Sequence, residues 1–478
     1  MPATTQAIDG PNVAGRRRAW PGHSDTRAGL VLTVAVAVLY GWTVSFGFAN
    51  DDFTWIQRAR VLPGTRWWQA AFDHSVSPLF FRPLVQLSFF LDQMVFGTDP
   101  FWYHLTNLLL EWVTVLLVWR VGRMLRLGRL SSVLLASLFV AHAAVPIAVS
   151  WVCARSDLLC TACFLAALLA HAANRTALAA TFFALAVASK ETAIGFPVVA
   201  AVVDWTSPAR MPWWRAARTY GVVLFIYLGV RATATAHAVP LPAALDAVAR
   251  GDPFAALQMV GDNLVGVAQC LLKPLPLQGP LAVAALCLLI AVCLWSTRGT
   301  KERRTTILGV AWMVVGVVPF LGHFTFSAYY VYLASVGYAL TVVSVGQAAI
   351  ATAGRWKQRI AFVGLAVWLV ASVVQLEQKN EQQRRNALMS ARVIDAVVDA
   401  VPQPPRGVVL RVGGLGPLRL GHDPWARTPV LLFGLADALR TRFDDPTLDV
   451  AFDAHVTPET GPPLIELRWD AHTRRMLR

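Results

Sequence analysis

Long apolar stretches, repeated along the chain, constrain the fold more than any other feature of this sequence. Several of them reach the roughly 20 residues that an α-helix needs to cross the hydrocarbon core of a bilayer. Of the 478 residues, 56% are hydrophobic and only 15% are charged, a more apolar balance than soluble domains of this length have. The sequence therefore predicts a mainly α-helical, polytopic membrane protein.

Hydropathy places about eleven spans along the chain. The stretch 176–204 is interpreted as a hairpin of two short spans, because a single helix would move every later basic loop to the other side of the membrane. No cleavable signal peptide is expected, since no small-residue cleavage site follows the first apolar run. The expected spans are residues 29–49, 102–119, 130–150, 156–173, 176–189, 192–204, 220–238, 280–296, 306–321, 331–351 and 360–376.

The excess of basic residues sets the expected orientation. The net charge is +14, with 42 Lys and Arg against 28 Asp and Glu. The basic residues gather between the apolar stretches, as the positive-inside rule predicts for cytoplasmic loops, so no nucleic-acid partner is expected. The N-terminus is then inside and the C-terminus outside. The clusters are Arg16–Arg18, Arg120–Arg129, Arg210–Arg218, Arg298–Arg304 and Arg355–Arg359.

This topology divides the chain into three parts. Residues 1–28 form a basic cytoplasmic tail, residues 29–376 form the transmembrane domain, and residues 377–478 form an extracytoplasmic C-terminal region. Within the transmembrane domain, segments 50–101 and 239–279 are expected outside.

Local patterns predict structure in these external segments. In the first, "RWWQAAF" and "FRPLVQLSFFLDQMVF" are amphipathic and are expected to lie as helices in the membrane interface. The tail begins with a polar helical stretch. Strand-like runs "GVVLRV", "PVLLFG", "LDVAF" and "LIELRW" follow it, with "LADALRTRF" as a helix. The tail therefore predicts a small α/β domain.

Two adjacent carboxylates, Asp51 and Asp52, follow the first span directly. Neighbouring like charges raise the pKa of one of them, and a carboxylate at the edge of a low-dielectric cleft is suited to act as a general base. A solvated helix end is the alternative interpretation of the same pair.

Further polar side chains stand near the predicted spans. Arg82 opens an interfacial helix, where it is expected to pair with a phosphate or with the acidic pair, or to extend toward the interface as a simple anchor. His104, Asn107 and Glu111 share one helical face, which predicts a polar cavity rather than a purely structural glutamate.

Two pairs of oppositely charged residues lie at predicted helix ends. Arg155 and Asp157 begin the fourth span, and Lys190 and Glu191 occupy the turn of the short hairpin. Either pair could form an ion pair that anchors a helix end. Alternatively, the two cations, Arg155 and Lys190, bind an anionic headgroup.

A late segment, "HFTFSAYYVYLAS", joins His323 to Tyr329 and Tyr330 at the expected outer face. A belt of interfacial aromatics accounts for the tyrosines equally well. The six cysteines indicate neither a disulfide framework nor a metal site, because Cys160 and Cys163 lie within an apolar helix. No cofactor is predicted.

Taken in order, several stretches resemble the C-type superfamily of polytopic glycosyltransferases, and most closely its protein O-mannosyltransferase-like branch, which includes tetratricopeptide-bearing members. The likeness covers residues 29–390 and rests on the ordered set more than on any single motif. The set comprises the acidic pair, "FRPL", "HLTN", "AHAAVPIAVSWVCARSDLL", "SKE" and "YYVYLASVGYAL".

The resemblance implies a glycosyltransferase that takes a sugar from a polyprenyl-phosphate donor and transfers it outside the cytoplasm, directly and with inversion. It assigns the general base to Asp51 and a supporting role to Asp52. The carboxylates then lie at the membrane edge because the phosphate of the donor lies there. The sugar stays unidentified, and the acceptor is a protein, a glycan or a lipid.

The chain departs from the family pattern in places. The late motif of the family resembles "ERYLYLPS", whereas residues 328–335 read "AYYVYLAS" and lack the arginine. Phosphate binding then falls to Arg155, Lys190 or Arg82, and a divalent cation that bridges phosphate and carboxylate is left open. The tail shows no tetratricopeptide pattern.

Two other functions compete with this one. A transporter or flippase of lipid-linked sugars would need polar groups along a complete path, whereas the polar residues gather at one face. A catalytically weakened relative that acts as a scaffold is suggested by the altered late motif. The alanine- and arginine-rich composition is typical of bacteria, which would place the protein in the inner membrane with its site facing the periplasm.

Overall fold

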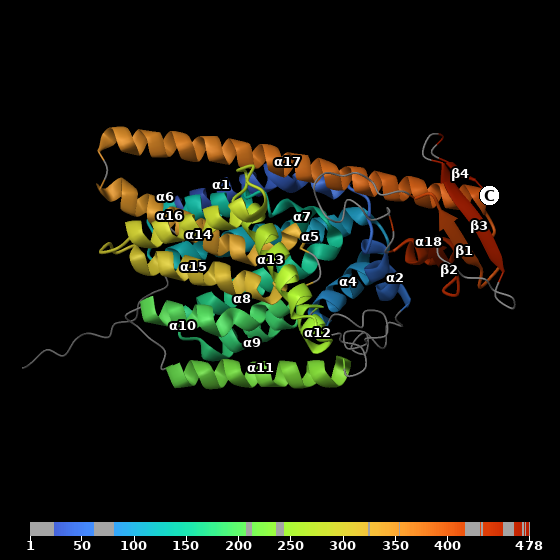
Figure 1. Cartoon of the computed structure of the whole chain (residues 1–478), viewed down its shortest axis with the longest axis horizontal. Helices are drawn as coiled ribbons and strands as arrows, with labels where there is room; N and C mark the ends of the chain where they lie inside the picture. Colours follow the sequence, from blue (N-terminus) through green and yellow to red (C-terminus); the bar gives the residue numbers. More distant parts are fainter. Residues whose placement is uncertain are drawn as a thin grey trace, which may run out of the picture.

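The computed structural model shows a long helical bundle with a small sheet at one end (Figure 1). The predicted class, a mainly α-helical bundle with a C-terminal α/β domain, is confirmed. The structure describes residues 23–61, 81–206, 213–235, 243–323, 326–352, 354–415, 431, 434–452, 463–470, 473 and 475–477.

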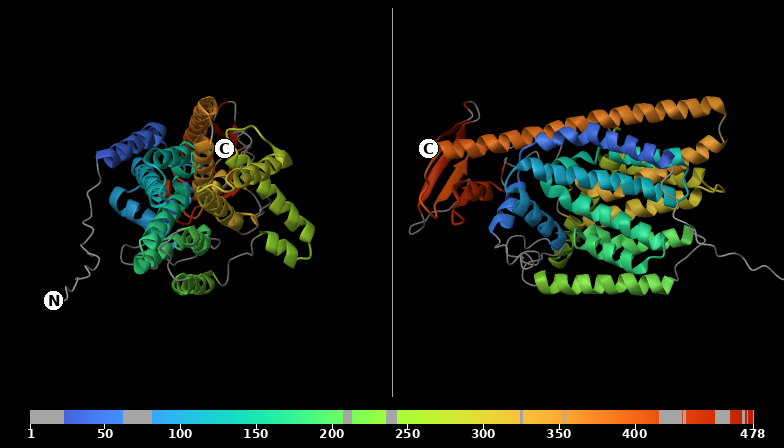
Figure 2. Two further views of the ribbon diagram at one scale, coloured as in Figure 1. Left: turned by 90° about the vertical axis from the view of Figure 1, so that its left-hand side faces the viewer. Right: turned by 180° about the vertical axis from the view of Figure 1, so that it is seen from behind.

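The bundle helices run roughly along the long axis of the molecule and pack side by side (Figures 1 and 2). Each predicted span overlaps one of them, although the span 130–150 is divided between α6 and the short α7 (Pro146–Ser150). The bundle helices are α1 (His23–Tyr40), α5 (Pro100–Met124), α6 (Arg129–Val140), α8 (Arg155–Ala172), α9 (Thr176–Val187), α10 (Phe196–Thr206), α11 (Trp213–Thr235), α14 (Gly279–Ser296), α15 (Arg303–Val317), α16 (Tyr332–Thr352) and α17 (Arg355–Ala400).

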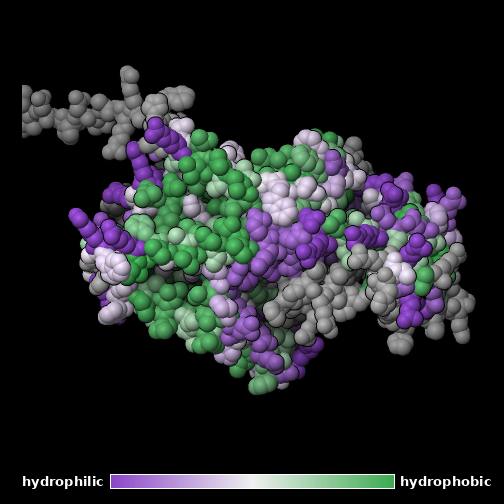
Figure 3. Space-filling view, turned by 90° about the horizontal axis from the view of Figure 1, so that it is seen from above, coloured by the Kyte–Doolittle hydropathy of each residue, from purple (hydrophilic) through white to green (hydrophobic). Residues whose placement is uncertain are grey.

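The chain is an integral, multi-pass membrane protein. Among the described residues, 8 helices are long and apolar enough to cross a membrane, and α4 (Pro83–Phe96), α6 and α9 are shorter apolar helices. Figure 3 shows hydrophobic side chains gathered in a band over the helical part, with hydrophilic side chains at both of its ends. Such a band is the surface that a bilayer would cover.

One long apolar helix was not expected. Within the segment 239–279, which the sequence assigns to an external loop, the chain forms α12 (Ala243–Ala249) and α13 (Pro253–Leu271), and α13 is itself long and apolar enough to cross a membrane. Its buried Asn263 donates hydrogen bonds to the carbonyl oxygens of Leu321 and His323, at 3.1 and 2.6 Å. Asn263, one of the polar residues that lower the hydropathy of α13, therefore joins this helix to the segment after α15.

Short helices gather at the end of the bundle that carries the sheet, called the sheet end below (Figure 1). They include α2 (Asp52–Val61), α4, α7 (Pro146–Ser150) and α12. The turn between α14 and α15, which contains Arg298 and Lys301, lies at the opposite end, as does the start of α17 with its basic cluster Arg355–Arg359 (Figure 1). The predicted helix "RWWQAAF" lies outside the described residues.

The C-terminal domain follows α17 directly in the chain. Its sheet has the order β2-β1-β3-β4, with β1 (Val409–Gly413) parallel to β2 (Asp449–Phe452) and to β3 (Leu464–Asp470). The predicted strands around 409, 449 and 464 and the helix α18 (Leu435–Phe443) are confirmed, whereas most of "PVLLFG" lies outside the described residues. The short antiparallel β4 (Arg475–Leu477) was not expected.

One hydrophobic core joins this domain to the rest of the chain. Val393 and Val397, on the last turns of α17, pack with Leu410 of β1 and Leu439 of α18. Phe53 of α2 packs against the same core. The domain is therefore anchored both to the long helix and to the helix that begins at the acidic pair.

Candidate active site

The acidic pair lies on a tight turn between the first bundle helix and α2. After α1 the chain forms the short 3-10 helix η1 (Gly41–Ser45), and Asn50 adopts a left-handed conformation with φ of 51°. Asparagine is among the few residues that tolerate this region. The turn reverses the chain so that Asp51 precedes α2 and Asp52 opens it.

Asp52 is held firmly by the backbone. It is 1% exposed, and its two carboxylate oxygens accept hydrogen bonds from the N–H groups of Ala49 and Cys153, at 2.9 and 2.7 Å. Burial raises the pKa of Asp52, although the two N–H donors oppose that shift. Asp52 therefore joins its own turn to the segment that precedes α8.

Asp51 has a different environment. Its side chain is partly exposed, and among the described residues it has no hydrogen-bond or ion-pair partner. The protein around it raises the pKa of Asp51 to about 6 by burial. A carboxylate with this pKa and no protein partner is suited to accept a proton near neutral pH.

The ionisable residues that the sequence singled out form ion pairs, with partners other than those predicted. Arg155 pairs with Asp92 at 2.6 Å, Lys190 pairs with Asp157 at 2.6 Å, and Arg82 pairs with Glu191 at 2.9 Å. The expected local pairs, Arg155 with Asp157 and Lys190 with Glu191, were wrong. Residues so close in sequence point to different neighbours, and each finds its partner on another element.

The charges lie close enough to influence one another. Although burial raises the pKa of Glu191, the charges of Arg82 and Lys190 outweigh it and lower that pKa to about 2. Burial lowers the pKa of Arg82, but the negative charges of Glu191 and Asp157 raise it. We call these three ion pairs, together with Asp51 and Asp52, the ionic cluster.

Arg155 is enclosed by protein. Its guanidinium is fully buried and donates to the side-chain oxygen of Asn107 at 2.8 Å and to the carbonyl of Tyr103 at 3.0 Å, and it lies 4.5 Å from the centre of the Phe89 ring. These contacts give it a positioning role rather than an exposed headgroup-binding one.

Asn107 extends this scaffold. Its amide nitrogen donates to the carbonyl oxygens of Val149, Trp151 and Val152, at 3.3 to 3.4 Å. Those residues lead directly to Cys153, whose N–H binds Asp52. Arg155 and Asn107 therefore fix the segment that holds the acidic pair in place.

The late aromatic segment packs on Lys190. The Lys190 nitrogen lies 4.9 Å from the centre of the Tyr329 ring and 5.4 Å from that of Tyr330. Tyr330 stacks on Phe320 at 4.2 Å, and His323 contacts both rings. The tyrosines are thus part of the site region and cover its lysine, in addition to any interfacial role.

His104 and Glu111 contact different parts of the chain. A ring nitrogen of His104 lies 3.4 Å from the carbonyl oxygen of Gly47, just before the acidic pair. Glu111 is fully buried and hydrogen-bonds the hydroxyl of Tyr332. The structure therefore brings His104 near the ionic cluster and places Glu111 in a separate contact between α5 and α16.

Among the described residues, no group of three or more His, Cys, Asp or Glu side chains is arranged to hold a metal ion.

Several curated proteins are similar to this chain in sequence. The chain is 34% identical over 203 residues to protein O-mannosyl-transferase Tmtc1 of Drosophila melanogaster, a match that covers 39% of this chain and 24% of the relative. It is 34% identical over 190 residues to Tmtc2 of the same organism, covering 35% and 20% of the two chains. Human TMTC3 is 30% identical over 188 residues, covering 36% and 20%.

Over 35–39% of its length, the chain is similar in sequence to protein O-mannosyl-transferases. The resemblance predicted from the ordered motifs is thereby confirmed. The matched regions span about a quarter or less of the length of these mannosyltransferases. No family model matches the sequence.

Two solved structures are similar in arrangement. The oligosaccharyltransferase of Archaeoglobus fulgidus has a TM-score of 0.48 at 10% identity, covering 80% of this chain and 62% of that one. ArnT from Cupriavidus metallidurans, solved with undecaprenyl phosphate, has a TM-score of 0.44 at 15% identity, covering 88% and 89%.

Two residues of the site region were not identified from the sequence as site residues. Asp92 is the partner of Arg155, and Asn107 is its second ligand. The signal for Asp92 was present, because it is an isolated carboxylate within the apolar run "FFLDQMVF". Asn107 was noted only as a member of a helical face.

Proposed function

We propose that this chain is a membrane glycosyltransferase that transfers a sugar from a polyprenyl-phosphate donor to an acceptor hydroxyl, with inversion. The similarity to protein O-mannosyl-transferases supports the reaction class, and it favours mannose as the sugar and a protein as the acceptor. The proposal places the reaction at the sheet end, on the non-cytoplasmic face, and the composition favours a bacterial inner membrane.

The observation that carries this proposal is the contrast within the acidic pair. Both oxygens of Asp52 are engaged by backbone N–H groups, whereas the carboxylate of Asp51 has no partner among the described residues. Asp51 is therefore the carboxylate that is available to an acceptor, and Asp52 maintains the turn that presents it.

The proposed reaction is a single displacement. Asp51 accepts the proton of the acceptor hydroxyl while the hydroxyl oxygen attacks the anomeric carbon of the sugar. The bond from that carbon to the phosphate oxygen breaks, and the polyprenyl phosphate leaves with the bonding electrons. Attack from the face opposite the phosphate inverts the configuration at the anomeric carbon.

The test measures sugar transfer in membranes that contain the chain, with a panel of radiolabelled polyprenyl-phosphate sugars. We expect Asp51→Asn to lower the transfer rate by about 10²- to 10⁴-fold at unchanged protein level, because the general base is lost. Asp99→Asn is the matched control, since Asp99 caps α5 on the same segment and asparagine preserves a cap. Substantial transfer by Asp51→Asn would exclude Asp51 as the base.

The same assay gives a pH profile. The pKa of Asp51 is raised to about 6, and only the deprotonated carboxylate accepts a proton. Transfer should therefore be low below pH 6 and rise as the pH passes through about 6. Failure of the wild-type chain to consume any donor would instead favour the transport or scaffold alternatives.

A further inference from the structure

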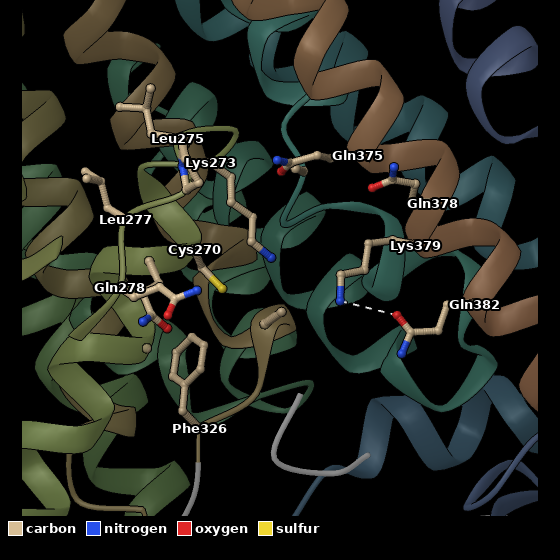
Figure 4. A pocket seen from close by; sticks show the side chains of 15 residues that line it. Cys270, Lys273, Leu275, Leu277, Gln278, Phe326, Gln375, Gln378, Lys379 and Gln382 are labelled. Carbon is tan, nitrogen blue, oxygen red and sulfur yellow. Dashed lines mark hydrogen bonds between the residues drawn. The ribbon is translucent and has the colours of Figure 1, made fainter. Parts of the chain in front are cut away.

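A cavity of about 560 Å³ opens between α13, the segment that follows it and α17. None of its lining residues was identified from the sequence as a site residue. Lys273 reaches it from the loop after α13, and Lys379 reaches it from α17; Figure 4 shows their ammonium groups directed toward one another across the space. The volume is in the usual range for a ligand pocket.

The polar lining of the cavity fits an anion. Besides the two lysines, the described lining contains the amides of Gln269, Gln278, Gln375, Gln378 and Gln382, and it contains no Asp or Glu. Lys379 donates to the side-chain oxygen of Gln382 at 3.4 Å, a contact that keeps its ammonium group within the pocket (Figure 4). Paired ammonium groups with nearby amide donors are suited to the oxygens of a phosphate.

The rest of the lining is apolar, and the surroundings face lipid. Leu275, Leu277 and Phe326 form part of the wall. The pocket adjoins the first turn of α14, whose Leu281 is 64% exposed. A ligand whose phosphate lies between the lysines can thus extend a hydrocarbon chain along surfaces that a bilayer would cover.

The cavity also adjoins the ionic cluster. The 3-10 helix η6 (Ala328–Val331) separates them: Ala328 lines the pocket, while the next residue, Tyr329, packs on Lys190. The cations of the cluster, Arg82, Arg155 and Lys190, are all engaged in ion pairs with carboxylates. Lys273 and Lys379 place two ammonium groups in the wall of the adjoining pocket.

We propose that this pocket binds the phosphate group of a membrane lipid between Lys273 and Lys379. Identifying that lipid as the polyprenyl-phosphate donor rests on the proposed function, whereas the binding of a lipid phosphate does not. The polyprenyl carrier and ordinary anionic phospholipids share this chemistry, and a binding measurement distinguishes them.

The experiment measures binding to the purified full-length chain in detergent, by the rise in unfolding temperature with ligand concentration. The probes are a polyprenyl phosphate, phosphatidic acid and inorganic phosphate. We expect the polyprenyl phosphate to stabilise the wild type, and Lys273→Gln and Lys379→Gln each to weaken its binding at least about tenfold. Lys301→Gln is the matched control, because Lys301 is 90% exposed at the opposite end of the bundle.

Each outcome decides the question. Lysine-dependent binding of the polyprenyl phosphate alone supports a carrier site, and equal binding of phosphatidic acid supports a general site for lipid phosphates. Binding that is unchanged in both lysine variants, or binding of inorganic phosphate alone, would overturn the proposal. Lys273→Arg and Lys379→Arg should keep binding, which separates loss of charge from misfolding.

The proposed function is tested separately by the same proteins. Asp51→Asn should bind the polyprenyl phosphate like the wild type while losing sugar transfer. If transfer proceeds but binding is independent of the lysines, only the pocket assignment fails. If binding depends on the lysines but no donor is consumed, only the glycosyltransferase proposal fails.

Discussion

Helix α2, which follows Asp51, is held from two sides by contacts of very different character. On the bundle side, Asp52 binds the segment that Arg155 and Asn107 fix. On the other side, α2 contacts α18 of the C-terminal domain and the residue after it through polar side chains. The contacts are Thr54 to Asp437 at 2.8 Å, Thr441 to Gln57 at 2.6 Å and Arg60 to Asp444 at 2.8 Å.

The two sides differ in burial. On the bundle side of α2, Asp52 is 1% exposed and the side chain of Arg155 is 0% exposed, whereas the side chains of Arg60 and Asp444 on the other side are 34% and 85% exposed. Removing one partner of a buried pair leaves an uncompensated charge in a low dielectric, but an exposed ion pair contributes little. We therefore expect the buried contacts within the bundle to hold the acidic turn more strongly than the exposed ion pair with the C-terminal domain does.

The largest effect is expected in the bundle. Lys190→Met leaves the Asp157 carboxylate buried without its cation and should destabilise the chain by about 3–5 kcal/mol. The measurement is thermal unfolding in detergent. Lys190→Met combined with Asp157→Leu should recover most of the loss, because neither charge is then buried. A single variant as stable as the wild type would contradict the importance that we give to this pair.

An intermediate effect is expected where α18 meets the acidic turn. Gly434 caps α18 with φ of 102°, and a Cβ at this position would overlap the carbonyl oxygen of Asn50, next to Asp51. Gly434→Ala should therefore push α18 away from α2 and reduce sugar transfer more than it reduces stability.

Gly407→Ala is the matched control for this variant. Gly407 also has a positive φ, of 70°, but its added Cβ would meet only Thr447, at an ordinary 3.7 Å. Both variants carry a similar backbone strain within the C-terminal domain. Equal loss of transfer in the two would show that domain stability, rather than contact with the turn, is responsible.

The smallest effect is expected at the exposed edge of the same contact. Arg60→Ala removes the ion pair with Asp444 and should change stability by at most about 1 kcal/mol, with a difference that shrinks at high salt. Unfolding temperatures at low and high salt test this, with Arg250→Ala as the control for a surface pair that lies away from α2. A loss as large as that of Lys190→Met would reverse the comparison.

The sequence predicted the helices and much of the C-terminal domain because these depend on local periodicity. The apolar stretches each gave a helix, and the spacing of Leu435, Ala438 and Leu439 gave the buried face of α18. Which residues form ion pairs with one another does not depend on local sequence. Lys190 and Glu191 are adjacent, yet one binds α8 and the other binds the start of α4.

The pocket was missed for the same reason. Lys273 and Lys379 are 106 positions apart and belong to segments that looked unremarkable by themselves, one a loop and the other a polar helical stretch. Only the tertiary fold, which brings α17 beside the segment after α13, places their ammonium groups in one cavity. Asp51, in contrast, was found because both its residue type and its position after an apolar run carry information.

Helix α17 runs unbroken for 46 residues, so it is about 69 Å long. A bilayer core accounts for only about 30 Å of that length. The length of the remaining part determines how far the sheet lies from the membrane. The helical phase at its end determines the direction in which α18 faces. Because each residue turns an α-helix by about 100°, a one-residue insertion would rotate the domain away from the acidic turn, whereas seven residues would restore its direction but raise it by about 10 Å.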